Sequence, residues 1–351
     1  MQFTTLVLDA PGPPLLYEEI DRFLERGLAV TLNLYYFTDK DSIKKHYGSR
    51  VGYAEINGHD ERAFIAAVDQ AGGYSVIKTR LNIPLGGELI RTASSPGLPT
   101  PLRAIAQAGS GLNHIDRQAC EHHQVAILHT PGSNAGAVAE YVLAQALFLS
   151  RDLDHYNTQT HQGYWAKGTL APSPECCELV LGLVGTGSIA QQVARKAGAL
   201  GIKVIATGSE RFTEQVAHSL GLERRQTLAQ LLDEAHIVSI HVPLTAQTRG
   251  LFGCAEFKQM RQGSVLINTA RGGIVDEQQL AAFMTLYPSH IKAVAIDTFA
   301  LEKDRFSSPL AGIPRAQLTP HIAGNTTTAI RTASHRIVDT IHALRQAVTG
   351  G

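Results

Sequence analysis

Three residues with side chains suited to acid–base chemistry follow apolar stretches in the last third of the chain. Arg271 comes shortly after residues 264–268, Glu302 shortly after Asp297, and His321 stands in the tripeptide Thr-Pro-His. A guanidinium pairs with a carboxylate and polarises a nearby carbonyl oxygen. An imidazole donates a proton to that oxygen during reduction and takes the proton away during oxidation. A glutamate beside the histidine favours the imidazolium form and fixes the ring tautomer. Together they predict proton transfer at the carbonyl group of a 2-oxo acid.

Each of these residues also fits a purely structural role. Arg271 and Glu302 are compatible with a surface ion pair, and His321 with the cap of a turn. All three residues follow apolar segments that are predicted to be strands. This position favours a catalytic role, because ligands of an open parallel sheet bind beyond the carboxyl ends of its strands.

A glycine-rich turn after the apolar run 179–184 predicts a dinucleotide-binding βαβ unit. Gly185 allows a tight turn, Gly187 lets backbone N–H groups approach a pyrophosphate, and Ala190 permits close packing of helix on strand. The phosphates then lie at the N-terminus of a helix over residues 189–200. A second strand at 203–207 supports this interpretation over that of a plain structural turn.

Apolar strands alternate with helical patterns along the chain, which predicts an α/β fold with doubly wound parallel sheets. Strands are expected at 4–8, 75–79, 102–107, 125–129, 179–184, 203–207, 236–241, 264–268 and 293–297. Helices are expected at 14–26, 61–71, 135–151, 189–200, 227–234, 254–260, 277–286 and 327–348. The polar stretch 154–178 is interpreted as an irregular surface connection.

Composition limits the classes of function. The chain has 351 residues, 44% of them hydrophobic, with 31 basic and 31 acidic side chains. This balance predicts no nucleic-acid partner, and the absence of a long apolar run predicts no membrane span. The four cysteines include adjacent Cys176 and Cys177, which are interpreted as reduced thiols of a cytoplasmic protein. Despite His122-His123, no metal site is predicted, because no carboxylate or cysteine stands at ligand spacing.

Several further segments occur in a characteristic order. They are residues 108–116 (AGSGLNHID), 130–134 (TPGSN), 138–140 (VAE), 241–245 (HVPLT) and 273–277 (GIVDE). With the glycine-rich turn and the segments around Arg271, Glu302 and His321, they make the chain resemble the D-isomer-specific 2-hydroxyacid dehydrogenases over most of its length. The resemblance implies a Rossmann-type cofactor domain, residues 131–323, inserted into a flavodoxin-like α/β substrate domain of residues 1–130 plus 324–351.

The resemblance also implies roles for individual residues. The catalytic residues are Arg271, Glu302 and His321. The implied cofactor-binding residues are Gly185, Thr186, Gly187, Ser188, Ile189, Ser209, Arg211, His241, Val242, Pro243, Thr248, Thr269, Ala270, Asp297 (near the nicotinamide) and Gly324. The implied substrate-binding residues are Arg80, Leu81, Gly109, Ser110, Gly111, Arg271 and His321. In the loop 79–82, backbone amides are expected to hold a substrate carboxylate. The side chain of Arg80 is interpreted either as a second cation for the substrate or as a solvated surface group.

The end of the strand 203–207 bears on the choice between NAD and NADP. NAD-preferring Rossmann enzymes usually carry a carboxylate there, which binds the ribose hydroxyls, but this chain has Gly208. Ser209 and Arg211 are suited to binding the 2′-phosphate of NADP. The carboxylate of Glu210 would oppose NADP binding if its side chain turned toward the phosphate. The segment therefore favours NADP over NAD.

The predicted function is reduction of a 2-oxo acid to a D-2-hydroxy acid. The alternative is a nucleotide-sensing, co-repressor-like protein of the same fold without significant turnover. Formate- or phosphite-type oxidation is disfavoured, because formate enzymes of this fold are expected to have a glutamine–histidine pair, whereas this chain has Glu302 and His321.

A homodimer is expected. The helix 135–151 resembles the dimerisation element of the family, although its alanine-rich face equally fits ordinary core. Residues 35–59 match no part of the family pattern, so the substrate's size stays open.

Overall fold

The computed structural model describes residues 3–165, 167–168, 170, 172–302 and 306–349. The chain forms two compact units, Met1–Asn134 with Thr326–Gly351, and Ala135–Asn325. The sequence-based borders lay at 130/131 and 323/324. The structure keeps residues 131–134 with the first unit, in which the Thr130 N–H donates to the Gly109 carbonyl (3.1 Å) and Ser133 N–H to that of Thr130 (3.4 Å).

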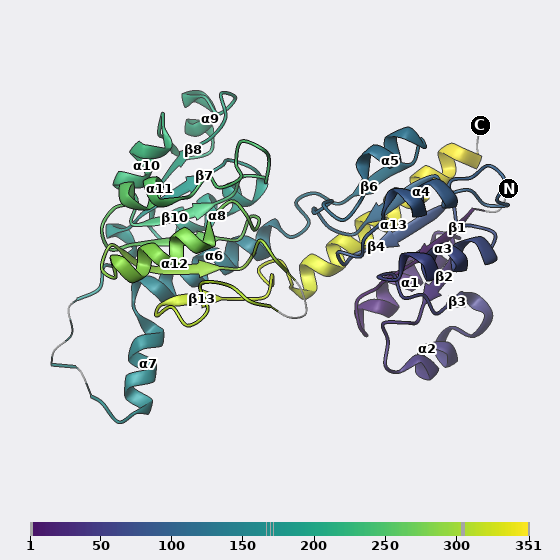
Figure 1. Ribbon diagram of the computed structural model, residues 1–351, viewed down its shortest axis with the longest axis horizontal. Coiled ribbons are helices and arrows are strands. Elements are labelled where there is room, and N and C mark those ends of the chain that lie inside the picture. Colours follow the sequence, from purple (N-terminus) through teal and green to yellow (C-terminus); the bar gives the residue numbers. More distant parts are fainter. Residues whose placement is uncertain (1–2, 166, 169, 171, 303–305, 350–351) are drawn as a thin grey trace. The chain divides into compact units, whose positions relative to one another are not determined.

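The first unit is built on a six-stranded parallel sheet with the order β3-β2-β1-β4-β5-β6 (Figure 1). The chain runs from β1 to one side and returns on the other at β4, the arrangement of flavodoxin-like sheets, with β3 as an added edge strand. The strands are β1 Thr4–Val7, β2 Ala29–Asn33, β3 Gly52–Ala54, β4 Val76–Thr79, β5 Ala104–Gln107 and β6 Ala126–His129. The helices are α1 Leu15–Glu25, α2 Lys40–Tyr47, η1 Gly48–Arg50, α3 Glu61–Gln70, α4 Gly87–Ala93, α5 Arg117–His122 and α13 Thr327–Thr349.

The last helix, α13, returns to this first sheet. Its buried side chains Ala333, Ile337 and Ile341 join the core on the α1 face of the sheet. Arg331 Nε of α13 lies 2.5 Å from Glu18 Oε2 of α1. The amphipathic pattern predicted for residues 327–348 is thus satisfied by α1 and the sheet.

Two strands of the first unit were not predicted. β3 has three residues, too few for a period-two pattern to be recognised. In β2 the polar residues Thr31 and Asn33 interrupt the apolar run. Asn33 is nevertheless fully buried, because its amide donates to the carbonyls of Leu8 (2.9 Å) and Ile56 (2.8 Å). That compensation depends on segments distant in the sequence.

The second unit holds a seven-stranded parallel sheet with the order β13-β12-β11-β10-β7-β8-β9. Six of its strands have the doubly wound Rossmann order, and β13 extends one edge. The strands are β7 Val180–Val184, β8 Lys203–Thr207, β9 Glu223–Arg224, β10 Ile237–Ile240, β11 Ser264–Asn268, β12 Ile291–Ile296 and β13 Ala316–Leu318. The helices are α6 Ala135–Ser150, α7 Leu153–His161, η2 Cys176–Glu178, α8 Ser188–Ala199, α9 Glu214–Ser219, α10 Leu228–Glu234, α11 Cys254–Gln259 and α12 Glu277–Leu286.

The helix α6 contributes to the core of the second unit. Val138, Ala139, Val142 and Ala146 are buried in a cluster shared with α8 and the strands. One alanine-rich face of α6 is therefore ordinary core, one of the two roles considered for it.

The expectation of an irregular connection over residues 154–178 is wrong at its start, where the structure forms α7. The sequence LDHYNTQTH has no apolar stripe, so periodicity gave no signal, and none of its residues is buried. Within the described residues, no helix is both long and apolar enough to span a membrane.

Candidate active site

The glycine-rich turn follows β7 at the carboxyl end of the second sheet. Gly185 has φ +104°, and a Cβ there would lie 2.8 Å from both the carbonyl carbon and oxygen of His241. Since His241 directly follows β10, the turn and the β10 loop are in backbone contact. Only glycine fits this position.

The helix α8 begins beyond the turn with its first N–H groups uncapped by any side chain. Gly187 is the N-cap, and a Cβ placed on it would meet no atom within 4 Å. A twelve-residue helix with a free N-terminus and open space above its N-cap fits a pyrophosphate. The residues present therefore fit the phosphates of a dinucleotide, with Ser188 and Ile189 in the first turn.

Gly208 follows β8 in a closely packed position. A Cβ there would lie 3.1 Å from Thr186 Oγ1 and 3.2 Å from Phe212 Cβ. Ser209 and Arg211 are exposed in the turn that the Phe212 N–H closes on the Ser209 carbonyl (2.8 Å). At this strand end the chain thus offers a hydroxyl and a guanidinium, with the exposed carboxylate of Glu210 between them.

The loop that carries Arg271 is shaped by its neighbours. Asn268, at the end of β11, accepts from Ala270 N–H and donates to the Arg271 carbonyl, both at 3.1 Å. A Cβ on Gly272 would lie 1.9 Å from the carbonyl oxygen of Phe299. The absence of a side chain at Gly272 therefore brings the Arg271 loop against the loop that precedes Glu302.

The turn around His321 is anchored by Asp297, which is fully buried after β12. Its Oδ1 accepts from Thr319 Oγ1 (2.6 Å) and Ile322 N–H (2.8 Å), and its Oδ2 accepts from Ala323 N–H (2.9 Å). His321 has φ +55°, in the left-handed region that non-glycine residues rarely adopt. These hydrogen bonds on either side of His321 hold it in that conformation. The Asp297 carboxylate is thus engaged by this turn, and its predicted contact with a nicotinamide stays a prediction.

His321 and Glu302 form the pair expected from the sequence. His321 Nδ1 lies 3.0 Å from Glu302 Oε2, and Phe299 N–H donates to Glu302 Oε1 (3.2 Å). The hydrogen bond that Glu302 accepts from His321 raises the pKa of His321 against the effect of burial, and the charges of Glu302 and Asp297 add to the increase. Burial raises the pKa of Glu302, but His321, the Phe299 N–H and the charge of Arg271 outweigh it, so that pKa is lowered.

The pair remains accessible from outside the unit. The His321 side chain is 43% exposed and that of Glu302 is 34% exposed. Nδ1 faces Glu302, so Nε2 is the ring nitrogen left for a ligand. The arrangement can present a proton to a bound molecule and stabilise the resulting charge.

The other predicted cofactor residues also lie at strand ends of the second sheet. His241 Nε2 lies 2.9 Å from Ser239 Oγ, and burial lowers the pKa of His241 to about 4, which keeps this imidazole neutral near pH 7. The segment after β10 carries Val242, Pro243 and Thr248. The segment after β11 carries Thr269 and Ala270, and Gly324 follows the turn around His321.

The predicted substrate loop belongs to the first unit. The N–H groups of Arg80 and Leu81 donate to Asp9 Oδ1 (2.8 Å) and Oδ2 (2.9 Å), and Thr79 Oγ1 donates to Oδ1 (2.7 Å). These two amides, expected to hold a substrate carboxylate, already hold a carboxylate of the chain. The side chain of Arg80 remains as the charged group that this loop offers.

The segment Gly109–Gly111 follows β5 in the same unit. The Gly109 carbonyl accepts from the Thr130 N–H at 3.1 Å, and Ser110 is exposed beside it. Gln107 of β5 accepts from the Gly109 N–H at its carbonyl (2.9 Å) and donates from its side chain to the Arg80 carbonyl (2.9 Å). The two predicted substrate segments are therefore neighbours through Gln107.

Three residues that organise these loops were not predicted from the sequence. Asp9 follows β1, so the rule that directs attention to strand ends applies to it as well. Thr319 and Tyr141 carry no such signal: Tyr141 of α6 places its hydroxyl 2.6 Å from Thr319 Oγ1, which in turn donates to Asp297. Within the described residues no cluster of three metal-ligating side chains is present.

A protein-family model described as "D-isomer specific 2-hydroxyacid dehydrogenase, NAD binding domain" matches residues 143–323, more than half of the chain. An (S)-sulfolactate dehydrogenase of Chromohalobacter salexigens is 40% identical over 225 residues, which cover 64% of this chain and 72% of that protein. A hydroxypyruvate reductase of Thermotoga maritima is 32% identical over 243 residues, 68% of this chain and 76% of the relative.

The chain belongs to the D-isomer-specific 2-hydroxyacid dehydrogenases. It is therefore an oxidoreductase of the family that interconverts 2-hydroxy and 2-oxo acids with a nicotinamide dinucleotide. The TT0316 protein of Thermus thermophilus shares the architecture, with a TM-score of 0.74 and 26% identity over 98% of this chain and 97% of that one. A putative D-isomer-specific 2-hydroxyacid dehydrogenase of Polaromonas, at 21% identity over 99% of this chain and 98% of that one, has the same fold with a TM-score of 0.78.

Proposed function

We propose that this dehydrogenase reduces a 2-oxo acid to the D-2-hydroxy acid with His321 as the proton donor. The observation that carries the proposal is the His321–Glu302 pair, 3.0 Å apart, with the pKa of His321 raised and the charge of Arg271 acting on both partners. The raised pKa favours the imidazolium of His321, which is the form required to protonate a carbonyl oxygen.

The residues divide the work as follows. Arg271 pairs its guanidinium with the substrate carboxylate and polarises the carbonyl oxygen. His321 delivers a proton from Nε2 to that oxygen, and Glu302 holds Nδ1 and stabilises the imidazolium. A nicotinamide dinucleotide, when bound, supplies the hydride. In the opposite direction, neutral His321 removes the hydroxyl proton.

A direct test is the loss of absorbance at 340 nm with NADPH and NADH in parallel. The substrates are glyoxylate, pyruvate, hydroxypyruvate, phenylpyruvate and bulkier or more highly charged 2-oxo acids. Turnover of at least one substrate to the D-product, identified by chiral chromatography, is expected. Nucleotide binding without turnover of any substrate contradicts the proposal and supports a nucleotide-sensing role.

NADP is the proposed cofactor, supported by the exposed Ser209 and Arg211 after Gly208. A charge-assisted hydrogen bond contributes about 1.5–3 kcal/mol, so Arg211→Gln is expected to raise the KM for NADPH about 10- to 100-fold. The KM for NADH should stay within about twofold, because NADH lacks the 2′-phosphate. Arg117→Gln, at an exposed arginine of the first unit, is the control. An equal rise for both nucleotides contradicts the assignment.

The pKa shift of His321 predicts how reduction depends on pH. Protonated His321 is the donor, so reduction is fastest below its raised pKa and is lost as the pH rises through it. Glu302→Gln removes the charge that favours the imidazolium, while burial still opposes it. We therefore expect the alkaline fall in kcat to move to lower pH, with Glu121→Gln, an exposed site, leaving the profile unchanged. An unmoved profile for Glu302→Gln contradicts the pairing.

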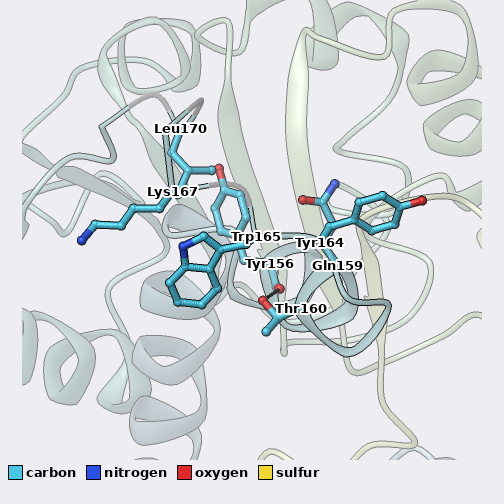
Figure 2. A pocket seen from close by; sticks show the side chains of 7 residues that line it. All are labelled: Tyr156, Gln159, Thr160, Tyr164, Trp165, Lys167 and Leu170. Atoms are coloured by element: carbon cyan, nitrogen blue, oxygen red, sulfur yellow. Dashed lines mark hydrogen bonds between the residues drawn. The ribbon is translucent and has the colours of Figure 1, made fainter.

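We further propose that the protein is a homodimer and that α7 with the residues after it contacts the second copy. None of the nine residues of α7 is buried, and so short a helix is marginal without packing. Trp165 is 80% exposed and Tyr164 is 64% exposed. They line a pocket of about 190 Å³ with Tyr156, Gln159, Thr160, Lys167 and Leu170 (Figure 2). This is smaller than typical small-molecule sites of about 300–1,000 Å³ and suits a partner's side chain.

Trp165→Glu is therefore expected to weaken the dimer, because a buried unpaired carboxylate strongly disfavours association. Sedimentation velocity measures the effect as a shift from dimer to monomer. Leu286→Glu, at a side chain of the same unit that is 72% exposed, should leave the dimer intact. A wild-type monomer, or an unchanged dimer in Trp165→Glu, contradicts the proposed surface.

For location, we propose the cytoplasm, where the four free cysteines stay reduced.

A further inference from the structure

The segment 273–277 leads into α12 of the second unit, and no step of the proposed reaction uses it. Its backbone pairs with Phe252, whose carbonyl accepts from the Asp276 N–H (2.9 Å). Asp276 also caps α12, because its Oδ1 accepts from the Gln279 N–H (3.0 Å). Glu277 is therefore the first residue of a helix whose start is held in place by neighbouring backbone.

The carboxylate of Glu277 binds the segment that carries Glu302 at two points. Its Oε1 accepts from the Ala300 N–H (2.9 Å), and its Oε2 accepts from Ser308 Oγ (2.8 Å). Ala300 precedes Glu302 in the chain and Ser308 follows it. These two hydrogen bonds, which we call the Glu277 clamp, thus join the chain on both sides of Glu302 to α12.

Both points of the clamp lie in packed structure. Ser308 is buried, so its hydroxyl needs the hydrogen bond that Glu277 accepts. Phe299, the neighbour of Ala300, is also buried, and its N–H donates to Glu302 Oε1 (3.2 Å). A shift of the chain at Ala300 would therefore move the backbone donor that orients the Glu302 carboxylate.

The position of Glu302 matters because its hydrogen bond supports the imidazolium of His321. Glu302 Oε2 lies 3.0 Å from His321 Nδ1, and this hydrogen bond is the largest cause of the raised pKa of His321. The charge of Asp297 adds to the increase, whereas burial and the charge of Arg271 oppose it. A hydrogen bond is lost beyond about 3.5 Å, so a small displacement of Glu302 removes its support.

We propose that Glu277 is a positioning residue of the reaction, whose carboxylate fixes the chain on both sides of Glu302 and so keeps Glu302 in contact with His321. The inference rests on the proposed function, in which His321 is the proton donor. Glu277 acts through Glu302 and not on the substrate. A carboxylate suits this role, because its two oxygens accept from two donors at once and hydrogen bonds to a charged group are the stronger ones.

The test compares changes at Glu277 with a change at its neighbour. Glu277→Ala removes both hydrogen bonds of the clamp. Glu277→Gln keeps an acceptor for the Ala300 N–H and offers an amide donor to Ser308 Oγ. Asp276→Ala is the matched control, because the Asp276 carboxylate holds Gln279 of its own helix. Both alanine variants should lower the melting temperature by a similar amount, about 2–4 °C.

Glu277→Ala is expected to lower kcat about 10- to 100-fold, the scale of a catalytic group displaced by up to about 1 Å. The alkaline fall in kcat should also move to lower pH, because His321 loses the hydrogen bond that raises its pKa. Glu277→Gln should stay within about threefold of the wild-type kcat, since it keeps both contacts. Asp276→Ala should keep the wild-type pH profile.

A double-variant cycle separates positioning from a general loss of stability. Glu302→Ala removes the group that the clamp places, so adding Glu277→Ala to it should lower kcat by less than about threefold further. NMR titration of the His321 ring needs no turnover, and it should give a lower pKa in Glu277→Ala than in wild type. Ser308→Ala removes one of the two hydrogen bonds and should be intermediate, which keeps the test available if Glu277→Ala does not fold.

Three outcomes overturn the inference. A wild-type kcat and pH profile in Glu277→Ala mean that Glu302 needs no clamp. An equally large loss in the Glu302→Ala background means that Glu277 does not act through Glu302. The same pH shift in Asp276→Ala means that the start of α12, and not the Glu277 carboxylate, is responsible. Failure of the wild type to reduce any 2-oxo acid removes the proposed function instead, and the NMR titration then tests the clamp by itself.

Discussion

Replacement of His321 by alanine is expected to lower kcat by about two to four powers of ten, the usual scale of general acid catalysis, while nucleotide binding persists. The imidazole is the proton donor of the proposed reaction, and its Nδ1 is held 3.0 Å from Glu302. The proposed pyrophosphate site lies elsewhere, at the glycine turn after β7, so removal of the ring should leave nucleotide binding intact.

The left-handed backbone of His321 requires a second variant. Alanine with φ near +55° is strained, so a change in the turn rather than loss of the ring could lower the rate. Asparagine tolerates this conformation but supplies no titratable proton donor. His321→Asn is therefore expected to match His321→Ala in kcat.

Steady-state rates at saturating NADPH measure the effect, and fluorescence titration measures nucleotide binding. His218→Ala, at an exposed histidine of the same unit, should behave as wild type. If both His321 variants kept a wild-type kcat, the acid–base assignment would be wrong. If wild type itself showed no turnover but bound nucleotide as well as His321→Ala does, a sensing role would explain both.

Gly272→Ala is expected to impair stability and activity together. Its Cβ would lie 1.9 Å from the Phe299 carbonyl oxygen and 2.0 Å from the carbonyl carbon, so one of two loops must move. Overpacking of this kind destabilises proteins by about 1–3 kcal/mol and sometimes more, and we expect the upper end because the obstacle is backbone. The loops that move carry Arg271 and lead to Glu302, so kcat/KM should also fall, by about 100-fold for a displacement of about 1 Å.

A second glycine of the same unit provides the matched control. Gly198 lies inside α8, and a Cβ there would meet no atom within 4 Å. Gly198→Ala should therefore be neutral or stabilise the protein by about 0.5–1 kcal/mol, because alanine favours helix. Denaturant unfolding and the 340 nm assay distinguish the two variants. A Gly272→Ala protein with wild-type stability and rate would show that the two loops do not require this close approach.

Local patterns in the sequence were enough to predict several strands, the glycine-rich turn and the catalytic candidates. The apolar runs identified four strands of the first unit and the strands β7, β8, β10, β11 and β12 of the second, because a buried parallel strand reads as a continuous apolar stretch. The glycine spacing identified the turn before α8, and the strand-end rule selected Arg271, Glu302 and His321. The structure does bring His321 and Glu302 together.

The contacts that hold these residues in place depend on the three-dimensional fold. Asp9 and Arg80 are 71 positions apart and Asp297 and Ala323 are 26 apart, so no local pattern links either pair. The same holds for Tyr141, which reaches Thr319 across 178 positions. The left-handed conformation of His321 is likewise contrary to the local preference of a histidine and exists because distant groups fix the turn. Local propensity places residues at strand ends, but hydrogen bonds between distant segments determine which of their atoms remain free to bind a ligand.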